Sequence, residues 1–329
     1  MILIRTPFRI SFLGGGTDFP EWYNKNEGLV ISSTINKYSY ITIKNLLPIY
    51  KFNYRLRYFK TEQLNNINKI KHPAIKIILQ KFHKNNSGLD FVYHSDIPGK
   101  SGLGGSSAFV VSLINAVHAF NGNILSKKQL AEKSIICEHK YLKENSGSQD
   151  QYACSYGGFN KIHFSKNNIL LKKLKISETK KKIIEQNSML IFTGSRFSDP
   201  IEKNKKKEIL KKSINYKEMF ELTNNSIDIF ENYKNDKFKN EFVRIMRESW
   251  KIKKELSKKV SNLKINNLYE YCLKNGAQAG KLLGAGGGGF MYLICKNKKS
   301  KLNLKKKLRK TLIFDFKFES EGSKIIYKI

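Results

Sequence analysis

The chain has 329 residues, of which 40% are hydrophobic and 12% aromatic, and its formal net charge is +34 at pH 7. This composition excludes a disordered chain, and the lack of an 18-residue apolar run argues against a transmembrane helix. The length predicts about two domains. The apolar N-terminus contains Arg5 and Arg9 and has no small-residue cleavage site, so we expect no signal peptide and a cytoplasmic protein without a membrane partner.

The positive charge comes from lysine far more than from arginine. Only 8 of the 61 basic residues are arginine, and the lysines are spread over the whole chain. Base readout and phosphate recognition favour arginine, so we interpret the charge as a solvated surface and expect no nucleic-acid partner. The four cysteines, at 137, 154, 272 and 295, form no CxxC pair and predict reduced, buried thiols rather than a metal site.

The first 60 residues are predicted to be β structure. Alternating apolar residues indicate strands up to about residue 13, interrupted by Pro7 and ended by three glycines at 14–16. A clearly alternating strand follows at 37–44 and a weaker one at 54–60. A helix that opens with Pro73 is expected over 73–84, and a strand over 89–95.

A glycine-rich segment, PGKSGLGGSSA at 98–108, separates this strand from a helix that is apolar nearly all round to residue 120 and should therefore be buried. Backbone N–H groups in such a loop, together with the start of the next helix, form an anion site. Ser106 and Ser107 stand at that helix start, where N-capping is the alternative role.

A second helix is expected over 126–143, with Ser126 as its N-cap. Glu138 falls inside the apolar arc of this helix, so its carboxylate requires a cation, a base or a metal. A buried ion pair and a metal site both satisfy that requirement. Asp150 lies twelve residues further on, beyond the expected helix end, where it could also cap another helix.

The second half of the chain mixes strands and helices. Strands are expected at 158–164, 168–174 and 188–193, followed by a helical region from about 201 to 281. A glycine cluster at 284–289 then leads into further elements, expected as a strand at 290–295, a basic helix near 300–310, and strands at 311–318 and 323–328. We expect two domains to meet between 165 and 187.

Three segments together resemble the signature motifs of the GHMP small-molecule kinases: RTPFRISFLGGGTD (5–18), PGKSGLGGSSA (98–108) and KLLGAGGGGF (281–290). Their order and spacing match as well, so the resemblance covers essentially the whole chain. It implies a two-domain α+β fold with the active site in the cleft between the domains. Residues 1–175 would bind ATP and Mg²⁺ and contain an unusual left-handed βαβ unit, and residues 176–329 would form a ferredoxin-like α/β sandwich.

The resemblance also implies roles for individual residues. Asp150 matches the family's catalytic aspartate, and Arg9 matches a basic residue near it and the transferred phosphate. Ser106 and Glu138 are expected to hold Mg²⁺, which takes few protein oxygens and completes its shell with water and phosphate. The expected ATP-binding residues are Pro98, Gly99, Lys100, Ser101, Gly102, Leu103, Gly104, Gly105, Ser106 and Ser107.

Within the family, one subgroup is most similar to this chain in the stretches at 7–23, 33–40 and 55–75. That subgroup uses ATP to phosphorylate the anomeric hydroxyl of D-glycero-D-manno-heptose 7-phosphate. Its product is used to make nucleotide-activated heptose for bacterial surface glycans. Galactokinases carry Glu-His where this chain has Gly15-Gly16, which argues against galactose. The expected substrate contacts are Asp18, Gly15, Gly16, Arg55, Arg57, Lys37, Gly286, Gly287 and Gly288. The basic residues among them are candidates for binding the phosphate group of the substrate. The alternatives are another sugar 1-kinase of the family, for fucose or an N-acetylhexosamine, and a non-catalytic sugar sensor; a dimer is one option for the oligomeric state.

Overall fold

The structure is a computed structural model that describes residues 1–84, 88–195 and 211–329. The first of its two sheets has eight strands: β1 (Ile2–Leu13), β2 (Gly28–Asn45), β3 (Tyr54–Arg57), β4 (Thr61–Leu64), β5 (Leu89–Ser95), β6 (Phe159–Ser165), β7 (Asn168–Lys173) and β12 (Lys324–Lys328). They follow the order β12-β1-β2-β5-β3-β4, and β6 pairs with β2 and β7. β3 and β5 are parallel, and the other pairs are antiparallel.

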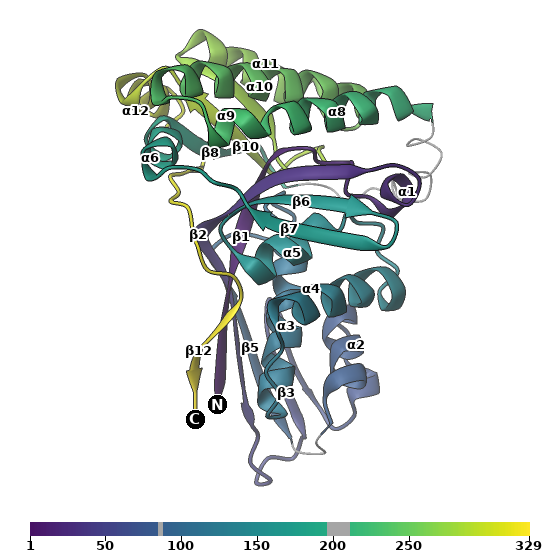
Figure 1. Cartoon of the computed structure of the whole chain (residues 1–329). Coiled ribbons are helices and arrows are strands. Elements are labelled where there is room, and N and C mark those ends of the chain that lie inside the picture. Colours follow the sequence, from purple (N-terminus) through teal and green to yellow (C-terminus); the bar gives the residue numbers. More distant parts are fainter. Residues whose placement is uncertain (85–87, 196–210) are drawn as a thin grey trace.

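Helices α2 (Pro73–Phe82), α4 (Lys127–Ile136) and α5 (Gln149–Tyr156) pack around α3 (Gly105–Phe120), as Figure 1 shows. α3 contacts both β1 and β2, and nearly all of its side chains are buried, which explains its apolar sequence. Ser126 caps α4 through a capping box with Gln129. The other helical elements of this half are α1 (Pro20–Tyr23), η1 (Ile67–Lys69) and the π-helical turn η2 (Cys137–Tyr141).

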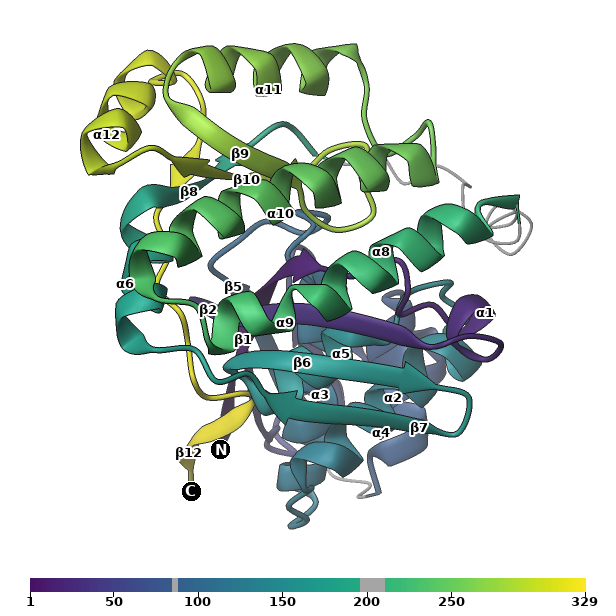
Figure 2. The same ribbon diagram turned by 45° about the horizontal axis from the view of Figure 1, so that its top comes forward.

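The second sheet is antiparallel and has the order β11-β8-β10-β9. Its strands are β8 (Ser188–Phe192), β9 (Ala277–Leu282), β10 (Phe290–Cys295) and β11 (Ile313–Phe314). Helix α10 (Asn235–Leu256) packs on β9, and α8 (Ser213–Asn225) contacts both α10 and strand β2 of the first sheet (Figure 2). The helices of this half are α6 (Glu178–Asn187), α8 (Ser213–Asn225), α9 (Ile227–Glu231), α10 (Asn235–Leu256), α11 (Leu263–Lys274) and α12 (Lys298–Lys307).

An aromatic core joins the two halves around Phe12, near the end of β1. Its ring stacks on Phe159 of the first sheet at a centroid distance of 5.3 Å. It also meets Tyr292 of β10 edge-on at 5.5 Å and Phe242 of α10 at 5.7 Å. The end of the chain then returns to the first sheet, where β12 pairs with β1. The halves therefore share buried aromatic surface near the end of β1.

The α+β fold class expected from the sequence is confirmed, and several details differ. Of the strand expected at 311–318, only Ile313–Phe314 is a strand. The N-terminal strand is continuous past Pro7, which sits at a register shift instead of ending a strand. The helix expected over 126–143 is α-helical to Ile136 and continues as the π-helical turn η2. The helical region expected from about 201 to 281 begins outside the described residues, and its last part is wrong, because Ala277–Leu282 forms strand β9.

Strand β9 is explained by its neighbour and not by its composition. A Cβ on Gly280 would lie 2.4 Å from the carbonyl oxygen of Tyr292, so only glycine allows this close approach to β10.

None of the helices in the described part of the chain is long and apolar enough to span a membrane.

Candidate active site

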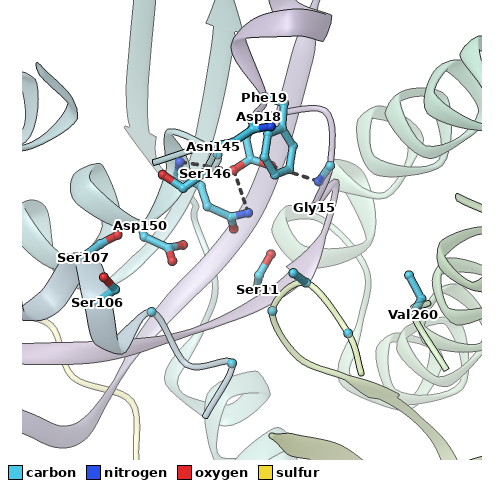
Figure 3. Close-up of a pocket in the computed structure, with 18 of the residues that line it drawn as sticks. Ser11, Gly15, Asp18, Phe19, Ser106, Ser107, Asn145, Ser146, Asp150 and Val260 are labelled. Atoms are coloured by element: carbon cyan, nitrogen blue, oxygen red, sulfur yellow. Dashed lines mark hydrogen bonds between the residues drawn. The ribbon is translucent and has the colours of Figure 1, made fainter. Parts of the chain in front are cut away.

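A cavity of about 410 Å³ is lined by residues from both halves of the chain. Its walls come from the end of β1 and the loop after it, the segments 100–107 and 144–150, helices α8 and α10, and the loop 284–286. In Figure 3, Ser106 and Ser107 lie near Asp150, and Ser11, Gly15 and Asp18 stand apart from them across the cavity. The structure thus brings residues of all three glycine-rich segments to one space.

The second and third glycine-rich segments contact each other backbone to backbone. The amide of Phe290 donates to the carbonyl of Ser101 over 2.8 Å. A Cβ on Gly102 would lie 2.5 Å from the carbonyl oxygen of Leu283, and a Cβ on Gly289 would lie 2.5 Å from that of Ser101. Side chains are excluded from both positions, so the loop 99–104, called the anion loop below, rests directly on the second half of the chain.

The anion loop runs straight into buried helix α3. Gly104 is the N-cap residue, with a left-handed φ of 78°, and no side chain caps the helix. The first amides of α3 therefore lack partners within the helix, and its positive end favours an anion at the cavity wall. The alternative N-capping role of Ser106 and Ser107 is wrong, since both lie in the first turn, Ser106 exposed and Ser107 buried.

Arg9 and Asp150 form a two-pronged ion pair at the cavity. Arg9 Nε donates to Asp150 Oδ1 over 2.6 Å, and Nη2 donates to Oδ2 over 2.7 Å. The remaining nitrogen, Nη1, donates to the carbonyl of Gly102 over 2.8 Å, which ties the pair to the anion loop. Asp150 belongs to the first turn of α5, but its carboxylate binds Arg9 and does not cap that helix. The geometry holds a carboxylate and a cation together beside an anion site.

Glu138 is fully buried, as the helical pattern predicts, and it lines the cavity. Its Oε2 accepts hydrogen bonds from Ser107 Oγ (3.1 Å), Ser146 Oγ (3.2 Å) and Gln151 Nε2 (2.5 Å). No lysine or arginine of the described residues forms an ion pair with it, so the ion-pair alternative is wrong. Burial and the charge of Glu144 raise the pKa of Glu138 to about 8.

The other oxygen of Glu138 fits a metal ion. Oε1 is buried without a hydrogen-bond partner, and a hard cation such as Mg²⁺ would satisfy it. The described residues contain no cluster of three acidic, histidine or cysteine side chains able to hold a metal, so phosphate and water would have to complete the shell. Of the two serines at the start of α3, Ser107 donates its hydroxyl to Glu138 and Ser106 does not, and both line the cavity.

Asp18 is buried on the other side of the cavity. Its Oδ1 accepts from the amide of Gly16 over 2.9 Å, and its Oδ2 accepts from Gln149 Nε2 over 2.9 Å. A Cβ on Gly147 would lie 1.9 Å from Oδ2, so this position must be glycine for Asp18 to fit. Burial raises the pKa of Asp18, and the nearby charge of Asp150 adds to the effect.

Sequence reasoning missed three cavity lysines as individual site residues: Lys253, Lys259 and Lys281. Lys281, the first residue of the third motif, is buried and donates to Phe12 O (2.8 Å) and Ser249 Oγ (3.1 Å). Burial lowers its pKa to about 7, and the cationic Arg9 contributes. Lys253 of α10 donates to the carbonyl of Gly284 over 2.6 Å and so braces the third glycine segment. The sequence gives no local signal for Lys281, because the segment around it was expected to be helical and is strand β9.

Several expected site residues lie elsewhere. Arg55 and Arg57 of β3 both bind Asp90, at 2.7 Å and 3.0 Å, and Lys37 lies 5.4 Å from the ring centroid of Phe314. The expected residues that do not line the cavity are Arg55, Arg57, Lys37, Pro98, Gly99, Leu103, Gly287 and Gly288. The structure therefore does not bring the three predicted phosphate-binding cations to the cavity.

Arg55→Ala is expected to affect stability and not substrate choice. Asp90 is almost fully buried, and losing one charged hydrogen-bond partner should lower the free energy of unfolding by about 1–3 kcal/mol. Since Arg55 does not line the cavity, kcat/KM for sugar substrates should stay within about twofold of wild type. Urea unfolding and steady-state kinetics measure the two quantities. A selective loss of activity toward a phosphorylated sugar, at unchanged stability, would show that Arg55 does bind substrate.

Comparisons with known proteins relate the chain to one family. Residues 68–158 match the profile of the GHMP kinases N terminal domain, and residues 229–313 match that of the GHMP kinases C terminal domain. The chain is 32% identical, over 98% of each sequence, to D-glycero-alpha-D-manno-heptose 7-phosphate kinase of Campylobacter jejuni.

Solved structures show the same similarity. A candidate sugar kinase of Campylobacter jejuni is 28% identical, with a TM-score of 0.72 over 100% of this chain and 98% of that one. A D-glycero-D-manno-heptose 1-phosphate kinase of Bacteroides thetaiotaomicron is 22% identical, with a TM-score of 0.74 over 100% and 99%. At 22% identity, the similarity to this second structure shows a shared fold and no more.

Proposed function

Because the chain belongs to the GHMP kinase family and is a sugar kinase of that family, we propose a specific reaction for it. It transfers the γ-phosphoryl group of ATP to the anomeric hydroxyl of D-glycero-D-manno-heptose 7-phosphate. The product is the 1,7-bisphosphate. The observation that carries the proposal is the end-to-end similarity to a heptose 7-phosphate kinase. The cavity adds chemical support, because an anion site and a carboxylate–arginine pair adjoin each other in it.

The proposed roles follow from the position of each group. The anion loop and the first amides of α3 bind the ATP phosphates. Asp150 accepts the proton of the sugar hydroxyl, and Arg9 orients that carboxylate and stabilises negative charge on the transferred group. Glu138, with Ser106 or Ser107, would hold Mg²⁺, whose charge offsets that of the phosphates. Asp18 binds a sugar hydroxyl.

Positive charge in the cavity suits two phosphorylated substrates. Its lining includes five cations, Arg9, Lys100, Lys253, Lys259 and Lys281, and four carboxylates, Asp18, Glu138, Glu144 and Asp150, of which Asp150 is paired with Arg9. The lysines attract anionic ligands to the cavity. The substrate phosphate is accordingly proposed to bind among these cations of the cavity.

The proposed location is the cytoplasm, and the proposed use of the product is in making nucleotide-activated heptose for bacterial surface glycans. The location is supported by the four cysteines, all free thiols and all buried. Reduced thiols of this kind are typical of proteins kept in a reducing compartment, which is also where ATP is made.

A panel of sugars and sugar phosphates, assayed for ATP-dependent ADP release, tests the proposal. We expect kcat/KM for heptose 7-phosphate to exceed that for unphosphorylated heptose by at least about 30-fold, because losing charge-assisted phosphate contacts costs about 2 kcal/mol or more. Equal values for the two sugars would contradict the substrate assignment. Faster turnover of fucose would favour another sugar 1-kinase, and no turnover of any sugar would favour a sensor.

A further inference from the structure

Lys281 is a buried amine that joins the two halves of the chain. It is 2% exposed. Its Nζ donates to Phe12 O of β1 over 2.8 Å and to Ser249 Oγ of α10 over 3.1 Å. None of the described residues forms an ion pair with it, although buried charged side chains are nearly always paired. The residues around Lys281 thus hold its amine in place without balancing its charge.

The two hydrogen bonds fix the end of β1 against the second half. The pairing of β1 with β2 shifts register between Ser11 and Leu13, so Phe12 is an extra residue on β1, as in a β-bulge. The carbonyl of this extra residue accepts the hydrogen bond from Lys281. Ser249 anchors the same amine to α10. Both contacts are structural.

A neutral amine is sufficient for these two contacts. A protonated lysine has three N–H donors, and a neutral one has two. Among the described residues, Lys281 has two acceptors, Phe12 O and Ser249 Oγ. It also lines the cavity, so a third proton would serve only a group that binds there. An anion is the group that would both accept this N–H and balance the charge.

The protein around Lys281 disfavours the charged form. Burial lowers the pKa of Lys281 to about 7, and the positive charge of Arg9 on β1 adds to the effect. On the neighbouring α10, Lys253 is a second cation, and its ammonium binds two backbone carbonyls. Tyr292 lies opposite Lys281 on β10, and burial raises the pKa of its phenol, so it brings no negative charge. A bound anion would reverse the shift of Lys281.

Lys281 adjoins the groups that the proposed function assigns to phosphate. Phe12, which accepts from it, lies three residues after Arg9 on the same strand. Leu283 lies two residues after Lys281, and a Cβ on Gly102 of the anion loop would lie 2.5 Å from its carbonyl oxygen. Arg9 also donates to the carbonyl of Gly102. Lys281 is therefore fixed between the strand that carries Arg9 and the segment that supports the anion loop.

We propose that Lys281 is a phosphate-binding residue of the active site, whose third N–H binds a phosphoryl oxygen in the cavity. The inference rests on the proposed function, which brings two such groups to the cavity, the γ-phosphoryl group of ATP and the phosphate of the sugar. Either supplies the same acceptor and the same negative charge. Because the bound anion favours the charged amine, Lys281 Nζ takes up one proton from the solvent as the phosphoryl group binds.

Proton uptake on binding is the direct test. Calorimetric titrations in two buffers of different ionisation enthalpy count the protons taken up at pH 8. One titration uses heptose 7-phosphate, and the other uses the Mg²⁺ complex of the β,γ-imido analogue of ATP. For one of these ligands, wild type should take up close to one proton more than Lys281→Met, because Lys281 is mostly neutral at this pH. The ligand that shows the difference is the source of the phosphoryl group. At pH 6 the difference should vanish.

Activity gives a second readout. Lys281→Met removes the charge and keeps a long unbranched side chain, and its kcat/KM for the ligand identified by calorimetry should be about 10²-fold below wild type at pH 7. The wild-type kcat/KM should fall as the pH rises above about 7, since the free enzyme must hold the third proton. This descending limb should be absent from Lys281→Met, a change that a purely structural role would not cause.

Lys180→Met is the matched control. Lys180 is also buried and donates to a backbone carbonyl, that of Phe230, over 2.7 Å, but it does not line the cavity. This variant should lose stability and keep the wild-type proton uptake and pH profile. If Lys281→Met does not fold, Glu138→Gln replaces it, because it removes the other cavity group with a pKa near 8. Proton uptake that persists in Glu138→Gln would support the assignment to Lys281, and its loss would overturn it.

The outcomes separate this inference from the proposed substrate. Equal proton uptake by wild type and Lys281→Met with both ligands would overturn the inference, make Lys281 a tie between the halves, and leave the substrate assignment standing. If the panel shows that another sugar is the substrate, that sugar replaces heptose 7-phosphate. The titration with the ATP analogue is unaffected by that change.

Discussion

Asp150→Asn is expected to lower kcat by about 10²- to 10⁴-fold, the usual contribution of a positioned proton acceptor. The amide keeps the shape of the carboxylate but cannot take the proton of the sugar hydroxyl. It also removes the charge that holds Arg9 through two hydrogen bonds of 2.6 and 2.7 Å. The KM for ATP should change little, because the anion loop and the first turn of α3 are retained. Steady-state kinetics with saturating heptose 7-phosphate measure the effect.

Asp90→Asn is the matched control for this variant. Asp90 is also a carboxylate paired with arginine, but it lies on β5 outside the cavity. It should lower the free energy of unfolding while leaving the kcat of the folded enzyme near wild type. If Asp150→Asn kept kcat within about threefold of wild type, the proton-acceptor role would be wrong and phosphoryl transfer would need no positioned base.

Glu138→Gln is expected to lower activity and to stabilise the metal-free protein at the same time. The loss of activity should reach about 10²-fold at saturating Mg²⁺, because a neutral amide is a poor ligand for a hard cation whose charge is worth several kcal/mol. The gain in stability has a separate cause, the buried charge of the carboxylate.

The sign of the stability change follows from the pKa. Burial raises the pKa of Glu138 from 4.5 to about 8, so between these values the folded state binds the proton more tightly than the unfolded state. The stabilisation of the folded protein by protonated Glu138 is fully present below about pH 4.5 and is lost as the pH rises through about 8. The uncharged glutamine suffers no such loss, and Glu138→Gln should therefore unfold at a higher denaturant concentration than wild type at pH 8.

Urea unfolding in EDTA at pH 5 and pH 8, together with a Mg²⁺ titration of activity, checks both parts. The advantage of Glu138→Gln in free energy of unfolding should be about 1–3 kcal/mol at pH 8 and smaller at pH 5. Wild-type activity of Glu138→Gln across the titration would remove Glu138 from the metal site. Equal stability of the two proteins at pH 8 would show that the charged carboxylate is already compensated.

Local sequence patterns predicted the elements better than the contacts between them. The helical period placed Glu138 on a buried face because that information lies within a few turns. Neighbouring helical residues point about 100° apart. Which of Ser106 and Ser107 faces Glu138 therefore depends on the exact residue at which α3 begins. Only the structure shows that Ser107 contacts Glu138.

Long-range pairing explains the remaining misses. Arg55 and Arg57 looked like spare cations because Asp90, their partner, lies more than thirty residues away and meets them only through the pairing of β3 with β5. Strand β9 contains alanine, glycine and glutamine, which give no β signal, and it is a strand because β10 lies beside it.

The backbone contact between the anion loop and the third glycine segment also bears on folding. A folding intermediate with only the first sheet in place would have α3 and its positive end, but nothing would hold the loop against Leu283 and Phe290. We therefore expect catalysis to appear only at the step in which the second sheet docks. Enzyme activity in this protein reports completed docking of the two halves, and it should recover later than helical circular dichroism during refolding.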